Sequence, residues 1–131
     1  MFTEEMPKLV AGYFKLFEAV ENHFRQRCAI ERLSSQGELA LVFKTAAGEP
    51  ALYFALRWDL WSRMNIPLWL GVRPDWSPAG ADEFAARHPG MAFTHDGYLM
   101  RPFDQSIAVD CDNPQPVIDS LYRELAAAGV C

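Results

Sequence analysis

One stretch of the chain, residues 51–73, limits the fold more than any other because it alternates twice between apolar and other side chains. The residues that share one face of the two alternating halves are Leu52, Phe54, Leu56, Leu68, Leu70 and Val72. Period-two alternation in segments this short is typical of strands with one face on a core. The polar break at residues 59–65 is interpreted as a helical turn or an irregular excursion. The stretch therefore predicts two consecutive strands of a sheet.

Patterns on both sides of this stretch complete an α+β domain. An apolar stripe at three- to four-residue spacing predicts one long helix from Glu4 to Leu33, and Gly12 within it predicts a close approach of another backbone. Residues 39–44 alternate and predict a strand before the central stretch. The turn-forming run 47–50 would join that strand to the next.

The second half of the chain predicts a short helix, a hairpin and a final helix. The short helix spans Ala81 to Arg87, and Asn113 would cap the last helix before Pro114. The pair Asp96-Gly97 lies between residues 91–95 and 98–103, and it is the preferred pair for a type I′ hairpin turn. The expected order is α-β-β-β-α-β-β-α, with a mainly antiparallel sheet packed against the long N-terminal helix and the C-terminal helix.

Size and charge exclude several classes of protein. With 131 residues, half of them hydrophobic, the chain is expected to form a single domain over residues 1–131, without linkers or repeats. Its net charge of −5 argues against a nucleic-acid partner, and no apolar run approaches the roughly 20 residues that span a bilayer. Three widely spaced cysteines and an N-terminus without the features of a secretion signal favour the cytoplasm.

Candidate catalytic groups are sparse. The sequence contains no nucleophile elbow, no metalloprotease motif and no glycine-rich phosphate loop. The run Asp110-Cys111-Asp112-Asn113 would gather oxygen atoms around a divalent ion, or it would simply cap the last helix. We expect no catalytic residue, metal or cofactor. The competing hypothesis is an enzyme that uses Asp59, Asp75, Asp96 or the Asp110–Asp112 pair.

The second face of the central strands offers a different kind of site. It combines aromatic and arginine side chains, which are enriched at binding hot spots, with the small residues Ala55 and Gly71. The candidate partner-binding residues on this face and in the adjoining loops are Tyr53, Arg57, Trp58, Trp61, Trp69, Arg73 and Trp76. If the face is open it is a binding surface, and if another element covers it, it is a second core layer.

Three segments resemble the C-terminal parts of uncharacterised prokaryotic proteins. They are IPLWLGVRPDW, GYLMRPFD and VIDSLYREL, within residues 50–127. Those proteins are grouped with PD-(D/E)XK nucleases and phage-defence neighbourhoods, so the resemblance implies a related fold. Asp75 follows Pro74 as in the nuclease motif. The second half of that motif is an acidic residue two positions before a lysine. It is missing here, because Met6, Tyr13 and Val42 stand two residues before the three lysines. The resemblance therefore implies a member without nuclease activity.

The predicted order of elements is also similar to that of the small acidic chaperones of type III secretion, which dimerise and hold extended segments of other proteins. The leading hypothesis is accordingly a non-enzymatic interaction module of a prokaryote or phage, of the inhibitor, immunity, anti-defence or secretion-chaperone type. It would bind another protein, or a second copy of itself, through the aromatic and arginine face. The alternative is a metal-dependent, nuclease-like or other hydrolytic enzyme that uses Asp75, Asp110 and Asp112.

Overall fold

The computed structural model describes residues 6–35, 37–87 and 89–130, and it has the expected α+β architecture. Within those ranges the order is α1 (Met6–Phe24), β1 (Ile30–Ser34), β2 (Glu38–Lys44), β3 (Pro50–Arg57), α2 (Trp58–Met64), β4 (Leu68–Val72), α3 (Pro78–Arg87), β5 (Phe93–His95), β6 (Tyr98–Pro102) and α4 (Gln115–Ala127). One sheet holds six strands in the order β1-β2-β3-β4-β6-β5, and every pair is antiparallel. None of the described helices is long and apolar enough to cross a membrane.

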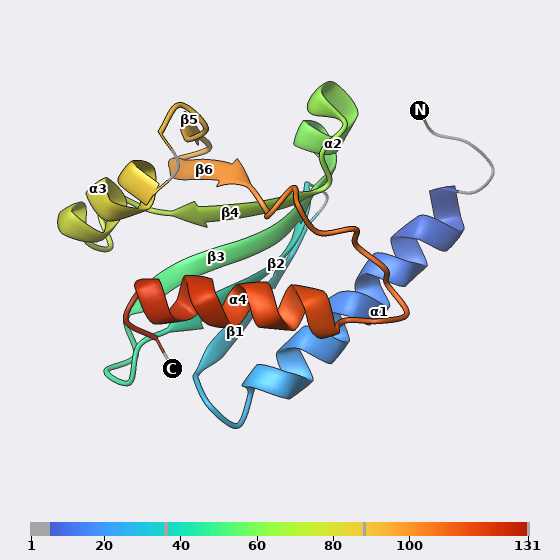
Figure 1. The fold of residues 1–131 in the computed structure, drawn as a ribbon, viewed down its shortest axis with the longest axis horizontal. Helices are drawn as coiled ribbons and strands as arrows, with labels where there is room; N and C mark the ends of the chain where they lie inside the picture. The colour runs from blue at the N-terminus through green and yellow to red at the C-terminus, as the bar shows by residue number, and fades with distance from the viewer. Residues whose placement is uncertain (1–5, 36, 88, 131) are drawn as a thin grey trace.

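The main core lies between one face of this sheet and the helices α1 and α4 (Figure 1). The alternating residues of β3 and β4 supply the sheet side, as the sequence predicts. Phe17 of α1 stacks on Phe54 of β3 with ring centroids 4.7 Å apart, and both side chains are fully buried. Leu121 and Leu125 of α4 extend the same core. The apolar residues that alternate along the strands therefore pack against the apolar stripes of the helices in one interface.

Helix α1 is shorter at its C-terminal end than the sequence predicts. It ends at Phe24, and residues 30–34 form β1 instead of a continuation of the helix. Ile30 pairs with Phe43 and Ser34 with Leu39, so β1 satisfies the backbone groups along one edge of β2. The apolar stripe also stops near Cys28. Pairing with β2 thus overrides a weak helical pattern at residues 30–34. The expected start of the helix at Glu4 lies outside the described residues.

Gly12 permits the close contact that the sequence predicts, although its neighbour is a side chain. A Cβ atom at this position would lie 3.2 Å from the Cβ of Cys111, in the connector between β6 and α4. The same connector is held to α1 by Lys15, whose ammonium lies 3.3 Å from Asp112. The connector therefore crosses α1 at its one interior glycine.

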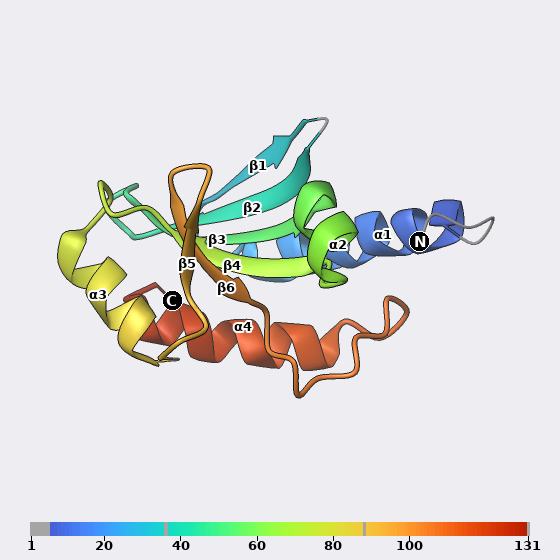
Figure 2. The same ribbon diagram turned by 90° about the horizontal axis from the view of Figure 1, so that it is seen from above.

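The second face of the sheet is covered, which decides the alternative that the sequence leaves open. The β5–β6 end of the sheet curls over towards β2 and β3 (Figure 2), and Leu60 of α2 covers another part. Tyr98 of β6 stacks on Tyr53 at 4.2 Å, and Phe93 of β5 meets Trp69 edge-on at 5.5 Å. Tyr53 and Trp69 are fully buried, so the hypothesis of an open binding face is wrong for them.

The hairpin turn has the geometry that its sequence predicts. Asp96 and Gly97 both have positive φ, 52° and 80° respectively, as a type I′ turn requires. A Cβ atom at position 97 would also lie 2.9 Å from a guanidinium nitrogen of Arg73. The last helix differs in detail, because Pro114 rather than Asn113 occupies its N-cap position.

Replacing Trp69 by alanine tests the covered face. The change removes a fully buried indole that donates a 2.7 Å hydrogen bond to the Ile66 carbonyl. We expect a loss of about 3–5 kcal/mol in the free energy of unfolding, measured by urea titration. Trp76→Ala, at a half-buried tryptophan, should cost less. A loss below about 1 kcal/mol for Trp69→Ala would mean that the face is open after all.

Replacing Gly97 by valine tests the turn. A β-branched residue is strained at positive φ, and here it would also displace Arg73. We expect a loss of about 1–2 kcal/mol or more in chemical denaturation. The matched control is Gly37→Val, because nothing lies within 4 Å of a Cβ atom at that glycine. Equal losses for the two variants would contradict the turn assignment.

Candidate functional site

The most connected polar cluster lies at the buried end of β3 and is centred on Arg57. This arginine is the last residue of its strand, is 5% exposed, and pairs in register with Glu38 of β2. Its guanidinium donates to both carboxylate oxygens of Asp59 at 3.2 and 3.1 Å, to Glu38 at 3.3 Å and to Asp96 at the hairpin tip. One cation therefore joins β2, α2 and the β5–β6 hairpin.

Two further side chains complete this Arg57 cluster. The hydroxyl of Tyr53 donates to Glu38 and lies 3.2 Å from the guanidinium of Arg57. The Nε2 atom of His95 lies 2.7 Å from an Asp59 oxygen. Burial penalises the charged form of Tyr53, and its pKa is raised far above the usual value. The tyrosine thus remains a neutral donor.

The electrostatics of Asp59 follow from the same contacts. Burial on its own would raise the pKa of Asp59, but hydrogen bonds from Arg57 and His95 outweigh burial and hold the pKa well below its usual range. Arg57 behaves in the opposite sense. Burial would lower the pKa of Arg57, and its hydrogen bonds to Asp59, Tyr53 and Asp96 raise it instead. The pair is therefore charged throughout the neutral range.

Asp59, His95 and Asp96 also place three ligand atoms within 4.8 Å of one another, which would suit a metal ion. The guanidinium of Arg57 already occupies the position of the cation, because it contacts both carboxylates. A metal ion there would face a buried positive charge at short range. We therefore assign the cluster a structural role, in which it fastens the hairpin tip to the end of β3.

The seven candidate partner-binding residues are divided among three places. Tyr53, Arg57 and Trp69 belong to the covered face. Trp58 and Trp61 stack on each other at the start of α2, where Trp61 also meets Tyr13 of α1 edge-on at 5.5 Å.

The other two candidates, Arg73 and Trp76, lie together beside Tyr98. The guanidinium carbon of Arg73 is 5.2 Å from the centre of the Tyr98 ring, and Trp76 meets that ring edge-on. Trp61 is 7% exposed, whereas Trp58, Arg73 and Trp76 are half-buried. No single aromatic and arginine surface therefore forms.

The carboxylates of the enzyme hypothesis are not brought together into one ligand set. Asp75 pairs with Arg73 at 3.0 Å, beyond the end of β4. Asp112 pairs with Lys15 of α1, and the Asp110 side chain accepts a hydrogen bond from the Asp112 backbone at 2.9 Å. Among the described residues, the cluster with metal-ligand spacing contains Asp59 and Asp96 from that hypothesis but neither Asp75 nor the Asp110–Asp112 pair.

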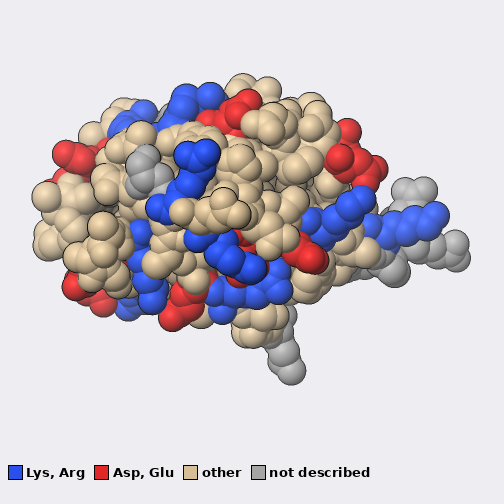
Figure 3. Space-filling model, turned by 90° about the horizontal axis from the view of Figure 1, so that it is seen from below, with Lys and Arg blue, Asp and Glu red and all other residues tan. Residues whose placement is uncertain are grey.

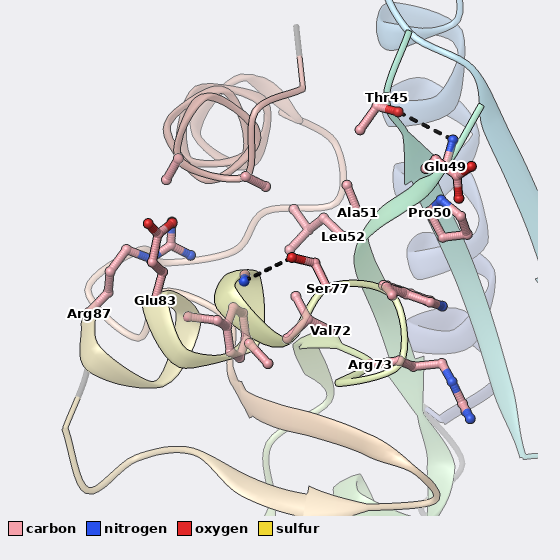
Figure 4. A pocket seen from close by; sticks show the side chains of 16 residues that line it. Thr45, Glu49, Pro50, Ala51, Leu52, Val72, Arg73, Ser77, Glu83 and Arg87 are labelled. Atoms are coloured by element: carbon pink, nitrogen blue, oxygen red, sulfur yellow. Dashed lines mark hydrogen bonds between the residues drawn. The ribbon is translucent and has the colours of Figure 1, made fainter. Parts of the chain in front are cut away.

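A cleft of about 240 Å³ lies between α3, the ends of β3 and β4, and the C-terminal end of α4 (Figure 4). Its walls are mostly apolar and include Leu52, Val72 and Phe84. Figure 4 shows Arg87 and Glu83 side by side at the α3 end of the cleft, across from the terminal turn of α4. Sequence patterns do not predict this cleft, because it depends on how α3 and α4 meet over the sheet.

Arg87 of α3, which lines the cleft, shares the carboxylate of Glu124 with Arg101 of β6, and these last two residues line a second pocket. Arg87 lies 2.6 Å from Glu124, and Arg101 contacts both Glu124 oxygens at 2.6 and 2.7 Å. Arg101 is 2% exposed. The Nε atoms of both arginines are buried without a hydrogen-bond partner in the described structure. The three residues are far apart in the sequence, and no local pattern marks them.

No family model, curated protein or solved structure matches the chain.

Replacing Asp59 by asparagine tests the Arg57 cluster through its dependence on pH. A carboxylate whose pKa is lower in the folded than in the unfolded chain contributes stability above its unfolded pKa of about 3.9, and that stability is lost as the pH falls towards the folded pKa. We expect Asp59→Asn to be less stable at pH 7 and to lose less stability than the wild type on acidification below about pH 4. Asp75→Asn, at an exposed ion pair, is the control. Parallel acid profiles for the wild type and Asp59→Asn would refute this role.

Proposed function

We propose that the protein is a non-enzymatic interaction module that binds an amphipathic, acidic helical segment of another protein. The observation that supports this is the distribution of large exposed apolar side chains. Within the described ranges these are Leu9, Phe14, Met64 and Met91, with exposed fractions between 42 and 48%. Leu9 and Phe14 lie on α1 and Met64 on α2, the two helices that touch through Tyr13 and Trp61.

The geometry of α1 favours a partner at this end. Its first turns extend past the sheet in both views (Figures 1 and 2), and burial becomes complete only from Leu16 onwards. Leu9 belongs to the same apolar stripe as Val20, yet it is 48% exposed because no described element lies beneath it. An exposed apolar side chain on a protruding helix, next to the half-buried Trp58 of α2, is a surface against which the apolar face of a partner helix would pack.

Charge favours an acidic partner over a second copy of the chain. Lys8 on α1 and Arg63 on α2 are exposed and have no ion-pair partner within the described structure. Figure 3 shows basic side chains at the protruding end of the molecule, with acidic side chains beside some of them. A symmetric dimer through this end would place these cations of two copies near one another, whereas carboxylates on a partner helix would neutralise them. Of the residues in the sequence-based prediction, the partner contacts would include the half-buried Trp58, whereas Trp61 is buried against Tyr13 and Trp58.

The proposal retains the prokaryotic interaction hypothesis of the sequence, of the inhibitor, immunity or chaperone type. It replaces the covered sheet face by the α1–α2 end. We further propose a cytoplasmic location, since three widely spaced cysteines provide no disulfide framework.

The test uses a labelled amphipathic peptide of about 16 residues, roughly four helical turns, with leucines on one face and glutamates on the other. We expect it to bind, and a peptide with lysines in place of the glutamates to bind at least tenfold more weakly. Met64→Glu should abolish binding because it adds a like charge to an apolar contact. Met91→Glu is the matched control, since Met91 is equally exposed, at 45%, but does not lie on α1 or α2.

Two results would contradict the proposal. One is equal binding of the two peptides or equal effects of Met64→Glu and Met91→Glu. The other is a wild-type dimer in sedimentation that Met64→Glu dissociates, because the occupant of this end would then be a second copy.

A further inference from the structure

The cleft between α3 and α4 is a hollow with an apolar middle. Its volume of about 240 Å³ exceeds the roughly 150 Å³ of an apolar cavity that accepts benzene. Leu52 of β3 and Val72 of β4 line it from the side of the sheet, and both are buried. Figure 4 shows Leu52 beside the space between α3 and the terminal turn of α4. Water in such a hollow contacts apolar wall, and an apolar ligand would release that water to the bulk.

Small residues on both helices leave this space open. Gly80 and Ala81 line the cleft from α3, and Ala127 and Ala128 line it from the C-terminal end of α4. The buried residues of α3 are Ala81 and Phe84, so this helix packs through one small side chain and one ring. Protein interiors are otherwise closely packed, and a concave, mostly apolar site beside the core is the kind that small ligands use.

The charges around the cleft cancel. Its lining contains two arginines, Arg73 and Arg87, and two glutamates, Glu49 and Glu83. Both arginines already contact a carboxylate outside the lining, at 3.0 Å for Arg73 and 2.6 Å for Arg87. The two glutamates are exposed, so solvent screens their charge. A charged ligand would therefore lose hydration in the cleft without gaining a counter-ion.

Two aromatic side chains in the wall favour a ligand that is itself a ring. Phe84 and Trp76 both line the cleft, and the first is buried whereas the second is half-buried. Trp76 meets Tyr98 edge-on at 5.9 Å, which supports the indole from outside the cleft. Aromatic rings that meet edge-on or offset gain more than the burial of their area alone provides.

We propose that this cleft binds a small, uncharged aromatic molecule, which packs against Leu52, Phe84 and Trp76 between α3 and α4. The ligand is selected by its size and by its lack of charge, since the lining provides an apolar wall and balanced charges. The site is separate from the α1–α2 end, so the inference does not rest on the proposed function.

The experiment compares toluene with benzoate and benzylamine, which are similar in size but are respectively neutral, negative and positive at neutral pH. Binding is followed by the rise in the midpoint of thermal unfolding and by NMR shifts of the indole N–H groups, at constant ionic strength. We expect saturable binding of toluene and at least tenfold weaker binding of both ions. The Trp76 indole should shift with toluene, and the Trp58 indole on α2 should not.

A matched pair of variants makes the result specific. Ala127→Leu places a larger side chain in the lining and should weaken toluene binding at least tenfold. Ala126→Leu is the control, because both alanines are exposed residues of α4 but Ala126 does not line the cleft. It should bind toluene as the wild type does. The acidic peptide should still bind to Ala127→Leu, which separates this site from the proposed function.

Several results would overturn the proposal. These are no saturable binding of toluene, equal binding of toluene and either ion, or equal toluene affinity in Ala127→Leu and Ala126→Leu. A shift of the Trp58 indole instead of Trp76 would also overturn it, because the ligand would then occupy the α1–α2 end. So would a wild-type dimer in sedimentation that Ala127→Leu dissociates, since a second copy would then fill the cleft. The three-ligand comparison in the wild type decides the matter even if Ala127→Leu does not fold.

Discussion

The buried guanidinium of Arg57 holds the curled sheet in its observed shape. It lies between three carboxylates that belong to β2, α2 and the β5–β6 hairpin, so its contacts span strands that are not neighbours in the sheet. Taking such a charge out of water is expensive, and its removal would leave several carboxylates without their counter-ion. The covered second face, with Tyr53 and Trp69 at its centre, depends on the hairpin that this arginine fastens.

The way in which the β5–β6 end of the sheet curls over the second face separates the parts of the fold that the sequence predicts from those that it does not. Alternation identifies β3 and β4, and the Asp-Gly pair identifies the hairpin, because these patterns report local backbone geometry. These local patterns do not show which face of the sheet a strand later in the sequence will cover. Whether Trp69 faces solvent depends on the path of β5, which lies more than twenty residues later. The paired apolar faces of β3 were nevertheless a signal, since a strand that is apolar on both sides is usually covered on both.

The candidate sites were less predictable than the fold for the same reason. Glu124 meets Arg87 and Arg101 from different elements, and Arg57 meets Asp96 across 39 positions of sequence. No local spacing marks such pairs. β1 was missed because the first turn-forming run after Phe24 is at residues 34–37, whereas pairing with the edge of β2 favours a strand at residues 30–34. The alternation of β3 and β4 predicted a partner-binding face of aromatic and arginine residues, but Tyr53, Arg57 and Trp69 on that face are buried.

The order of the strands has a consequence for how the chain folds. Apart from the β4–β6 pair, which encloses α3 and β5, every paired strand is adjacent to its partner in the sequence. Short loops close with little loss of entropy, so the meander β1-β2-β3-β4 can form early from local contacts. The contacts of α1 with α4, such as His23 with Tyr122, join residues 99 positions apart and need nearly the whole chain. We therefore expect the sheet to provide the folding nucleus, and the two covering helices to close the core together at the end.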